Sequence, residues 1–139
     1  MFPLEVVQDW LRASNRQDIE RMLALSDPNI ELVGPRGSGF GQQLLLDWLR
    51  RAGLTLQTRR TFARGDAVVM AQHGVWRSPD TGTVGEADVA SRFRVSGGLV
   101  VQFARHDDIT VALREAALSE ADEVPSPTEQ GTVADRPRD

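Results

Sequence analysis

The hydrophobic residues in the first third of the chain recur at the spacing of an α-helix. Val6, Trp10 and Leu11 fall on one helical face behind Pro3, a residue that the first turn of a helix tolerates. Asp18 is suited to cap a second helix, because its carboxylate can accept a hydrogen bond from a free backbone N–H. The pattern therefore predicts a helix over residues 3–14, a second after Asp18, a short strand at 30–33 and a third helix around 44–49.

From residue 54 onward, hydrophobic and polar residues alternate with the period of a β-strand. Turn signals such as Gly65-Asp66 and Ser96-Gly97-Gly98 separate the alternating runs, and short turns join antiparallel neighbours. Asp108 is suited to cap a last short helix that reaches Leu118. We therefore predict an α+β domain in which three helices and a short strand precede an antiparallel meander, with strands at 54–63, 67–77, 83–95 and 99–107.

The alternation also predicts which side chains of the meander share the face that the helices cover. The phase of Leu99 and Phe103 places most of the large apolar side chains on this inner face. Three ionisable side chains, those of His73, Arg105 and Asp107, fall among them toward one end of the sheet. We expect inner-face and helical side chains to line a pocket: Trp10, Trp48, Phe62, Val89, Ser91, Phe93, Val101 and Phe103.

The opposite face of the predicted sheet carries an apolar patch between charged side chains. The patch consists of Val68, Met70, Trp76, Val100 and Ala104. An exposed patch of this kind usually marks contact with a partner, so we expect a homodimer through this face. The alternative is a monomer with scattered apolar side chains, which are common on protein surfaces.

The composition removes several classes of chemistry. Lys, Cys and Tyr are absent from the 139 residues, which excludes a Schiff-base lysine, a catalytic thiolate and a phenolic acid. His106, Asp107 and Asp108 are adjacent, but neighbouring strand residues point to opposite faces, so we expect no metal site there. The Gly-rich run after residue 33 lacks both nucleotide-binding fingerprints, and we expect no cofactor.

The net charge of −4 is concentrated at the end of the chain. Residues 119–139 contain six acidic residues and two arginines, and they lack Leu, Ile, Phe and Trp. Such a segment buries too little apolar surface to offset its ordering entropy, so we predict a single domain over 1–118 and a disordered tail over 119–139. The predicted domain is neutral, and we expect no nucleic-acid partner.

The chain shows no pattern of membrane insertion or export. No apolar run reaches the roughly 20 residues that span a bilayer. The first residues lack the basic start and the apolar stretch of a signal peptide. We therefore expect a cytoplasmic protein without membrane contact.

Five stretches of sequence carry a family resemblance, and their order matters more than any single motif. They are Val6–Leu11, Asp18–Leu25, Ile30–Pro35, Asp47–Leu49 and Val100–Asp108. Over residues 4–118 the chain resembles the SnoaL-like branch of the nuclear-transport-factor-2-like superfamily. The resemblance implies a cone, in which three helices and a curved sheet enclose a ligand pocket. Members include polyketide cyclases, ketosteroid isomerases, epoxide hydrolases and non-catalytic modules, so the fold does not select an activity.

The catalytic residues of three groups in this family can be compared with the sequence. Where ketosteroid isomerases carry a tyrosine and two aspartates, this chain has Trp10, Gly34 and Ser91, so that mechanism is excluded. An arginine stands where limonene-epoxide hydrolases carry an acidic residue, which leaves their mechanism unsupported. Polyketide cyclases use an aspartate as acid or base, in some cases with a histidine. His73 and Asp107 match that pair loosely.

His73, Asp107 and Arg105 are therefore the candidate catalytic residues. A His–Asp contact poises an imidazole for acid/base chemistry near neutral pH, and Arg105 can hold Asp107 ionised or bind a ligand oxygen. We expect binding of a small, mostly apolar molecule in the cone pocket, with cofactor-free chemistry of the isomerase, cyclase or lyase type. Two alternatives stay open: an Arg–Asp pair that only satisfies itself, and a non-catalytic dimeric module that acts through the outer sheet face.

Overall fold

The structure is a computed structural model that describes residues 2–34, 37–52, 54–77, 81–82 and 84–125. Its elements follow the predicted order, with two additional short strands, β2 and β7, among the described residues. The elements are α1 (Pro3–Asn15), α2 (Ile19–Ala24), β1 (Ser26–Gly34), β2 (Gly37–Phe40), α3 (Gln42–Ala52), β3 (Leu54–Arg64), β4 (Ala67–Arg77), β5 (Val84–Ser96), β6 (Leu99–His106), α4 (Ile109–Ala116), the 3₁₀-helix η1 (Glu120–Asp122) and β7 (Glu123–Val124).

Local side-chain chemistry sets the helix starts that the sequence predicts. The Asp18 carboxylate accepts a hydrogen bond from the backbone N–H of Arg21 at 3.2 Å, and Asp108 accepts one from Thr110 at 2.8 Å. Both bonds satisfy a backbone donor that has no partner inside its helix. The two predicted caps are confirmed.

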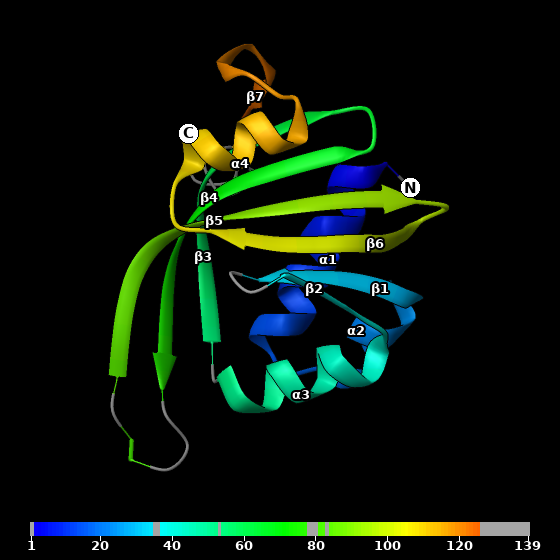
Figure 1. Cartoon of the computed structure of the whole chain (residues 1–139), viewed down its shortest axis with the longest axis vertical. Helices are drawn as coiled ribbons and strands as arrows, with labels where there is room; N and C mark the ends of the chain where they lie inside the picture. Colours follow the sequence, from blue (N-terminus) through cyan, green and yellow to red (C-terminus); the bar gives the residue numbers. More distant parts are fainter. Residues whose placement is uncertain (1, 35–36, 53, 78–80, 83, 126–139) are drawn as a thin grey trace, which may run out of the picture.

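The strands form one curved, open sheet in the order β2-β1-β6-β5-β4-β3-β7 (Figure 1). Neighbouring strands are antiparallel, except that β1 runs parallel to β6. Side chains from α1, α2 and α3 pack with the inner face of the sheet, whereas α4 packs on the outer face. This arrangement confirms the α+β cone, and it places the start of α4 beside the middle of β4 and β5.

The inner core is built around four aromatic rings. The ring centroids of Trp10, Phe93 and Phe103 lie 5.2–5.5 Å from one another, and the Trp48 ring lies 5.4 Å from that of Phe103. The Trp10 indole N–H donates to the Ser26 hydroxyl at 2.9 Å, which satisfies the polar atom of a fully buried side chain. These rings therefore hold the helices on the sheet.

Two β-bulges reverse the alternation that the hydrophobic pattern predicts. Arg59 is the extra residue in β3, so Phe62 lies on the outer face and packs in a second core beneath α4. Val101 is the extra residue in β6, so Val100 enters the inner core and Val101 is half-buried. The predicted inner-face positions of Phe62 and Val101 are wrong, because a bulge adds one residue and exchanges the two faces.

The β4–β5 hairpin is shifted by one position as well. His73 pairs with Asp88 and Gln72 pairs with Val89, so Gln72 shares the inner face with Val89 and His73 takes the outer face. The strands pair up to Arg77 and Val84, which leaves one residue more between them than the predicted five-residue turn. The predicted placement of His73 on the inner face is wrong for this reason. Residues 78–80 and 83 of the turn lie outside the described residues.

The same changes of register remove the predicted dimer surface. Val68, Val100 and Ala104 are fully buried and Met70 is 2% exposed, while only Trp76, at 36%, reaches the surface. The predicted patch is therefore wrong at four of its five residues, because three of them face the inner core and the small Ala104 is covered. The homodimer itself stays a prediction.

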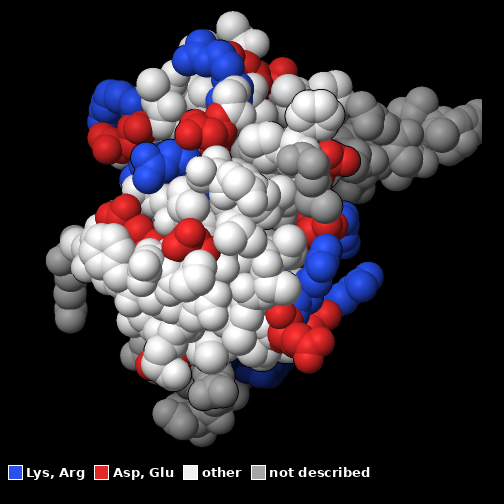
Figure 2. All heavy atoms as spheres, turned by 90° about the vertical axis from the view of Figure 1, so that its right-hand side faces the viewer, with Lys and Arg blue, Asp and Glu red and all other residues white. Residues whose placement is uncertain are grey.

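The ordered chain continues past residue 118, the predicted end of the domain. Residues 119–125 form η1 and β7, and β7 pairs with β3 through Thr61–Val124 and Phe62–Glu123. The predicted tail boundary is wrong for this stretch, since basic side chains of β3 neutralise its acidic residues. Acidic and basic side chains lie intermingled at the top of Figure 2, where Figure 1 places α4 and β7. Residues 126–139 lie outside the described residues.

The helices of the described chain are short or amphipathic. None of them, within residues 2–125 as described, combines the length and the apolar character that crossing a bilayer requires.

Candidate functional site

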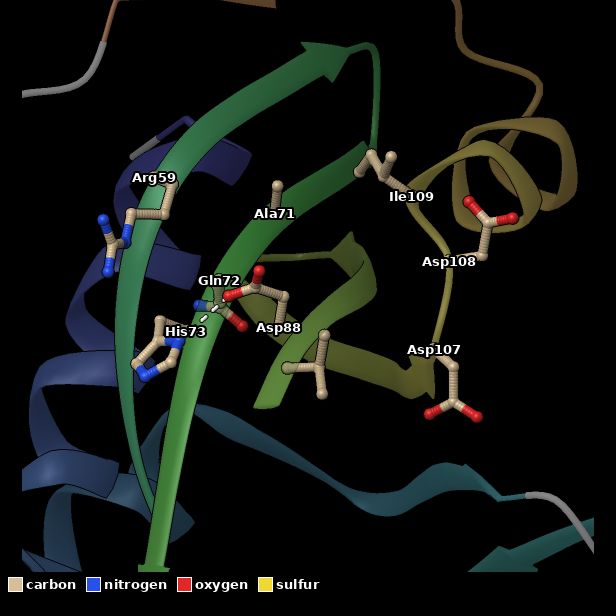
Figure 3. Close-up of a pocket in the computed structure, with 9 residues that line it drawn as sticks. Arg59, Ala71, Gln72, His73, Asp88, Asp107, Asp108 and Ile109 are labelled. Atoms are coloured by element: carbon tan, nitrogen blue, oxygen red, sulfur yellow. Dashed lines mark hydrogen bonds and ion pairs between the residues drawn. The ribbon is translucent and has the colours of Figure 1, made fainter. Parts of the chain in front are cut away.

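A cleft of about 630 Å³ lies between the start of α4 and strands β3–β5 (Figure 3). Ala71, Val89 and Ile109 give it an apolar floor, and charged side chains surround that floor. Because Gln72 and Val89 are almost fully buried, they form the deepest part of the lining. The complete lining is Arg59, Ala71, Gln72, His73, Asp88, Val89, Asp107, Asp108 and Ile109.

His73 stands on one wall of the cleft, held by two carboxylates of β5. Its Nδ1 lies 2.9 Å from Asp88 Oδ1 and its Nε2 lies 3.0 Å from Glu86 Oε1. Cross-strand pairing places Asp88 opposite His73, and the strand period places Glu86 on the same face. The hydrogen bond to Asp88, followed by that to Glu86, raises the pKa of His73, so the imidazole retains its proton to a higher pH than an isolated histidine.

Asp107 and Asp108 form the opposite wall, at the junction of β6 and α4 (Figure 3). Asp108 caps α4 and is thereby fixed. Asp107 is exposed, and in the described part of the chain its carboxylate has no hydrogen bond or ion pair. The cleft therefore has an imidazole of raised pKa on one side and, on the other, a carboxylate without a hydrogen bond or ion pair among the described residues.

The three predicted catalytic residues are only partly brought together. His73 and Asp107 line the same cleft, although the partners of His73 are Asp88 and Glu86 rather than Asp107. Arg105 pairs with Ser91 across β5 and β6, is exposed, and does not line this cleft. Arg105 therefore has no place in the site as the structure builds it.

Most of the predicted pocket walls serve the two cores instead. Trp10, Trp48, Phe93 and Phe103 pack on one another, and Phe62 packs beneath α4, whereas Val89 does line the cleft. The remaining predicted wall residues are Val101, which is half-buried, and Ser91, which is fully buried.

Ser91 belongs to a chain of buried polar side chains behind the cleft. Its hydroxyl donates to Gln72 Oε1 at 2.6 Å, and Gln72 Nε2 donates to the Thr58 hydroxyl at 3.1 Å. These bonds satisfy the amide of Gln72 and fix its side chain. The network therefore makes the deepest part of the lining rigid.

Arg59, Asp88 and Gln72 are lining residues that the pattern did not single out. Arg59 enters the cleft because the bulge gives it an extra position in β3. Asp88 enters because the longer turn places it opposite His73. The sequence offered one usable signal: the acidic residues Glu86 and Asp88 stand at alternate positions of β5, the strand that pairs with the His73 strand. Among the described residues, no group of three or more His, Asp or Glu side chains is arranged to hold a metal ion.

The sequence model of the SnoaL-like domain family matches residues 7–103. The chain belongs to this family. A solved structure described as an NTF2-like protein shares its cone fold. No curated protein matches the sequence.

Solved structures with the same fold include complexes with small molecules. One is TerC co-crystallised with polyporic acid: it is 23% identical, covers 82% of this chain and 96% of its own, and has a TM-score of 0.67. A Mycobacterium tuberculosis protein in complex with estradiol-17beta-hemisuccinate is 18% identical, covers 79% and 97%, and has a TM-score of 0.68.

A third solved structure with this fold is an epoxide hydrolase of Mycobacterium tuberculosis. It is 17% identical, covers 83% of this chain and 84% of its own, and has a TM-score of 0.67. At sequence identities of 17–23%, these three comparisons show that the fold is shared and nothing further. The SnoaL-like fold supports a ligand-binding pocket.

Proposed function

We propose that this SnoaL-like chain binds a small, mostly apolar molecule in the cleft between α4 and β3–β5. The further step of the proposal is cofactor-free proton transfer of the isomerase, cyclase or lyase type, carried by His73 and Asp107. The observation that carries the proposal is the joint presence of these two side chains on opposite walls of one cleft.

The dimensions and the floor of the cleft favour a small organic ligand. Its volume of about 630 Å³ falls within the range of small-molecule sites, roughly 300–1,000 Å³. Ala71, Val89 and Ile109 offer apolar surface in the middle, and the polar groups stand at the sides. A ligand with an apolar body and one or two polar atoms suits this division.

The two titratable walls suit opposite roles in proton transfer. The Asp107 carboxylate makes no hydrogen bond or ion pair among the described residues, so it is available to take a proton from a ligand carbon or hydroxyl. His73 carries the matching proton, because its raised pKa favours the imidazolium. Both of its nitrogens are engaged, so donation requires the ligand to replace one carboxylate. Asp88, which lines the cleft and has 89% of its side chain accessible, is the one we expect to yield.

Benzylacetone, an apolar ketone with exchangeable α-hydrogens, tests both parts of the proposal. We expect saturation-transfer NMR to detect its binding, and we expect the protein to accelerate exchange of its α-hydrogens in deuterium oxide. Ala71→Phe should abolish binding by filling the cleft. Thr55→Phe, at an exposed position of β3 outside the lining, is the matched control and should bind normally.

Asp107→Asn separates binding from chemistry. The amide keeps the shape of the carboxyl group but cannot act as a base, so binding should persist while exchange falls by roughly 100-fold or more. Equal binding by the wild type and Ala71→Phe would contradict the cleft as the site. Undiminished exchange in Asp107→Asn would remove the catalytic part alone. The homodimer and the cytoplasmic location stay predictions on which this proposal does not depend.

A further inference from the structure

The segment after α4 crosses the outer face and returns to the edge of the sheet. Ala117 adopts a left-handed conformation, with φ of 59°, which ends the helix, and Leu118 is buried in the outer core. Ser119 then caps η1, and Val124 pairs with Thr61 of β3. The chain is thus attached to α4 at one end and to β3 at the other.

Arg60 fastens this segment to β3 with several contacts at once. Its Nε and Nη2 donate to the two carboxylate oxygens of Glu123 at 3.0 and 2.8 Å, and Nη2 also lies 2.7 Å from Glu120 Oε1. The guanidinium stacks over the Phe62 ring, 4.9 Å from its centroid. A two-point arginine–carboxylate pair with a stacked aromatic ring fixes direction as well as charge. A second arginine, Arg64, reaches the carbonyl oxygen of Ala117.

One attachment point lies next to a wall of the cleft, and the other lies at the far end of the helix whose start forms the opposite wall. Arg60 follows Arg59, the bulge residue that lines one side. At the other end, α4 begins with Asp108 and Ile109, which line the opposite side. In Figure 1 the segment closes the top of the molecule above the strands that carry the cleft. Its length and its ion pairs therefore restrain the separation of the walls.

We propose that Leu118–Val124 is a strap that holds the walls of the cleft together, with Arg60 as its positioning residue. The strap deepens the function proposed for the cleft and rests on it. Arg60 does not line the cleft itself; it pairs with Ala71 of the lining and acts through its neighbour Arg59 and through α4. We call the contact of Arg60 with Glu120 and Glu123 the clamp. Loss of the clamp widens the cleft and weakens ligand binding without removing any lining side chain.

The clamp makes strap order depend on pH. The hydrogen bond from Arg60 lowers the pKa of Glu123 below its ordinary value of 4.5. Arg64, Glu120 and Asp122 are the other charged groups facing the contact. Folding lowers the pKa of this carboxyl group, so the group stabilises the clamped state at pH values above its ordinary pKa. This stabilisation disappears as the pH falls through the lowered pKa.

Amide hydrogen exchange and benzylacetone affinity, measured on the full chain, test the strap together. In Arg60→Gln we expect exchange at Glu123 and Val124, and at Ile109–Ala112 of α4, to rise roughly fivefold, since exposed ion pairs contribute modestly. Affinity should fall by a similar factor. The charge swap Arg60→Glu with Glu123→Arg should recover much of both losses. Arg94→Gln, an exposed arginine on β5 away from strap and cleft, should change neither.

The possible results distinguish the proposed ligand binding in the cleft from the proposed role of the strap. A strap that exchanges faster while α4 and the affinity stay unchanged would overturn the positioning role and leave the cleft intact. If the wild type binds no benzylacetone, the proposed function fails, and exchange at Ile109–Ala112 still decides whether the strap restrains the wall. No recovery in the charge swap, with a folded protein, would also overturn the clamp.

Discussion

His73 is the residue whose chemistry depends most on its neighbours. Its imidazole bridges Asp88 and Glu86, and these two hydrogen bonds raise its pKa. Both carboxylates are largely exposed, with 89% and 65% of their side chains accessible, so the bridge stabilises the fold only modestly. Its value to the site is that the His73 imidazole, whose pKa is raised, keeps its proton to a higher pH than an isolated histidine.

Asp88→Asn should lower the pKa of His73 toward its ordinary value of 6.5, because the strongest hydrogen bond to the imidazolium is weakened. An NMR titration of the His73 ring protons measures this shift. The bridge stabilises the folded state fully below pH 6.5 and ceases to do so as the pH rises through the raised pKa. An unchanged titration in Asp88→Asn would show that the contact does not form in solution.

Single residues also explain where the sequence misleads. Asp18 and Asp108 were predictable as caps, since capping needs only a local carboxylate and a free N–H. Arg59 and Val101 carry no such signal. A bulge places one extra residue between paired strands, and hydrophobicity alone does not show where it occurs. For that reason the helices and strands were predicted well, while the two faces were exchanged in parts of β3 and β6.

At the scale of elements, the sheet separates two cores, and α4 covers the outer one. Phe62, Val69 and Leu113 form the outer core, which is separate from the aromatic inner core. The outer core fixes the start of α4, and with it one wall of the cleft. The site thus depends on a core on the outer face of the sheet, where the sequence pattern predicted a dimer surface. His73 and Asp107 line one cleft, although the strand pairing contradicts the face assignment that placed them together, and their role as a site stays a prediction.

Phe62→Ala should lower the free energy of unfolding by about 3–5 kcal/mol, because a fully buried ring is removed beneath α4. Urea denaturation followed by circular dichroism gives the value. Val75→Ala, at an exposed position of the neighbouring strand, should change it by less than about 0.5 kcal/mol. A small effect of Phe62→Ala would mean that α4 does not pack on the sheet as described.

For the whole molecule, the acidic end of the chain has a structural role. Composition suggested disorder from residue 119, since the segment is charged and poor in large apolar residues. Yet Glu120 and Glu123 meet Arg60, which a composition average cannot reveal because the partners lie about 60 residues apart in the sequence. The cone encloses an aromatic core, and the described cleft opens outside that core, beneath the start of α4.

The central claim is that a small apolar ligand binds in this outer cleft, and an NMR titration with benzylacetone tests it most directly. If the ligand binds there, the Ala71 methyl and the Asp107 and Ile109 amide signals shift with a common saturation curve. The Trp10 indole N–H, buried in the inner core and bonded to Ser26, should not move. Shifts centred on Trp10, with Ala71 and Ile109 unchanged, would place the ligand inside the cone and contradict the account.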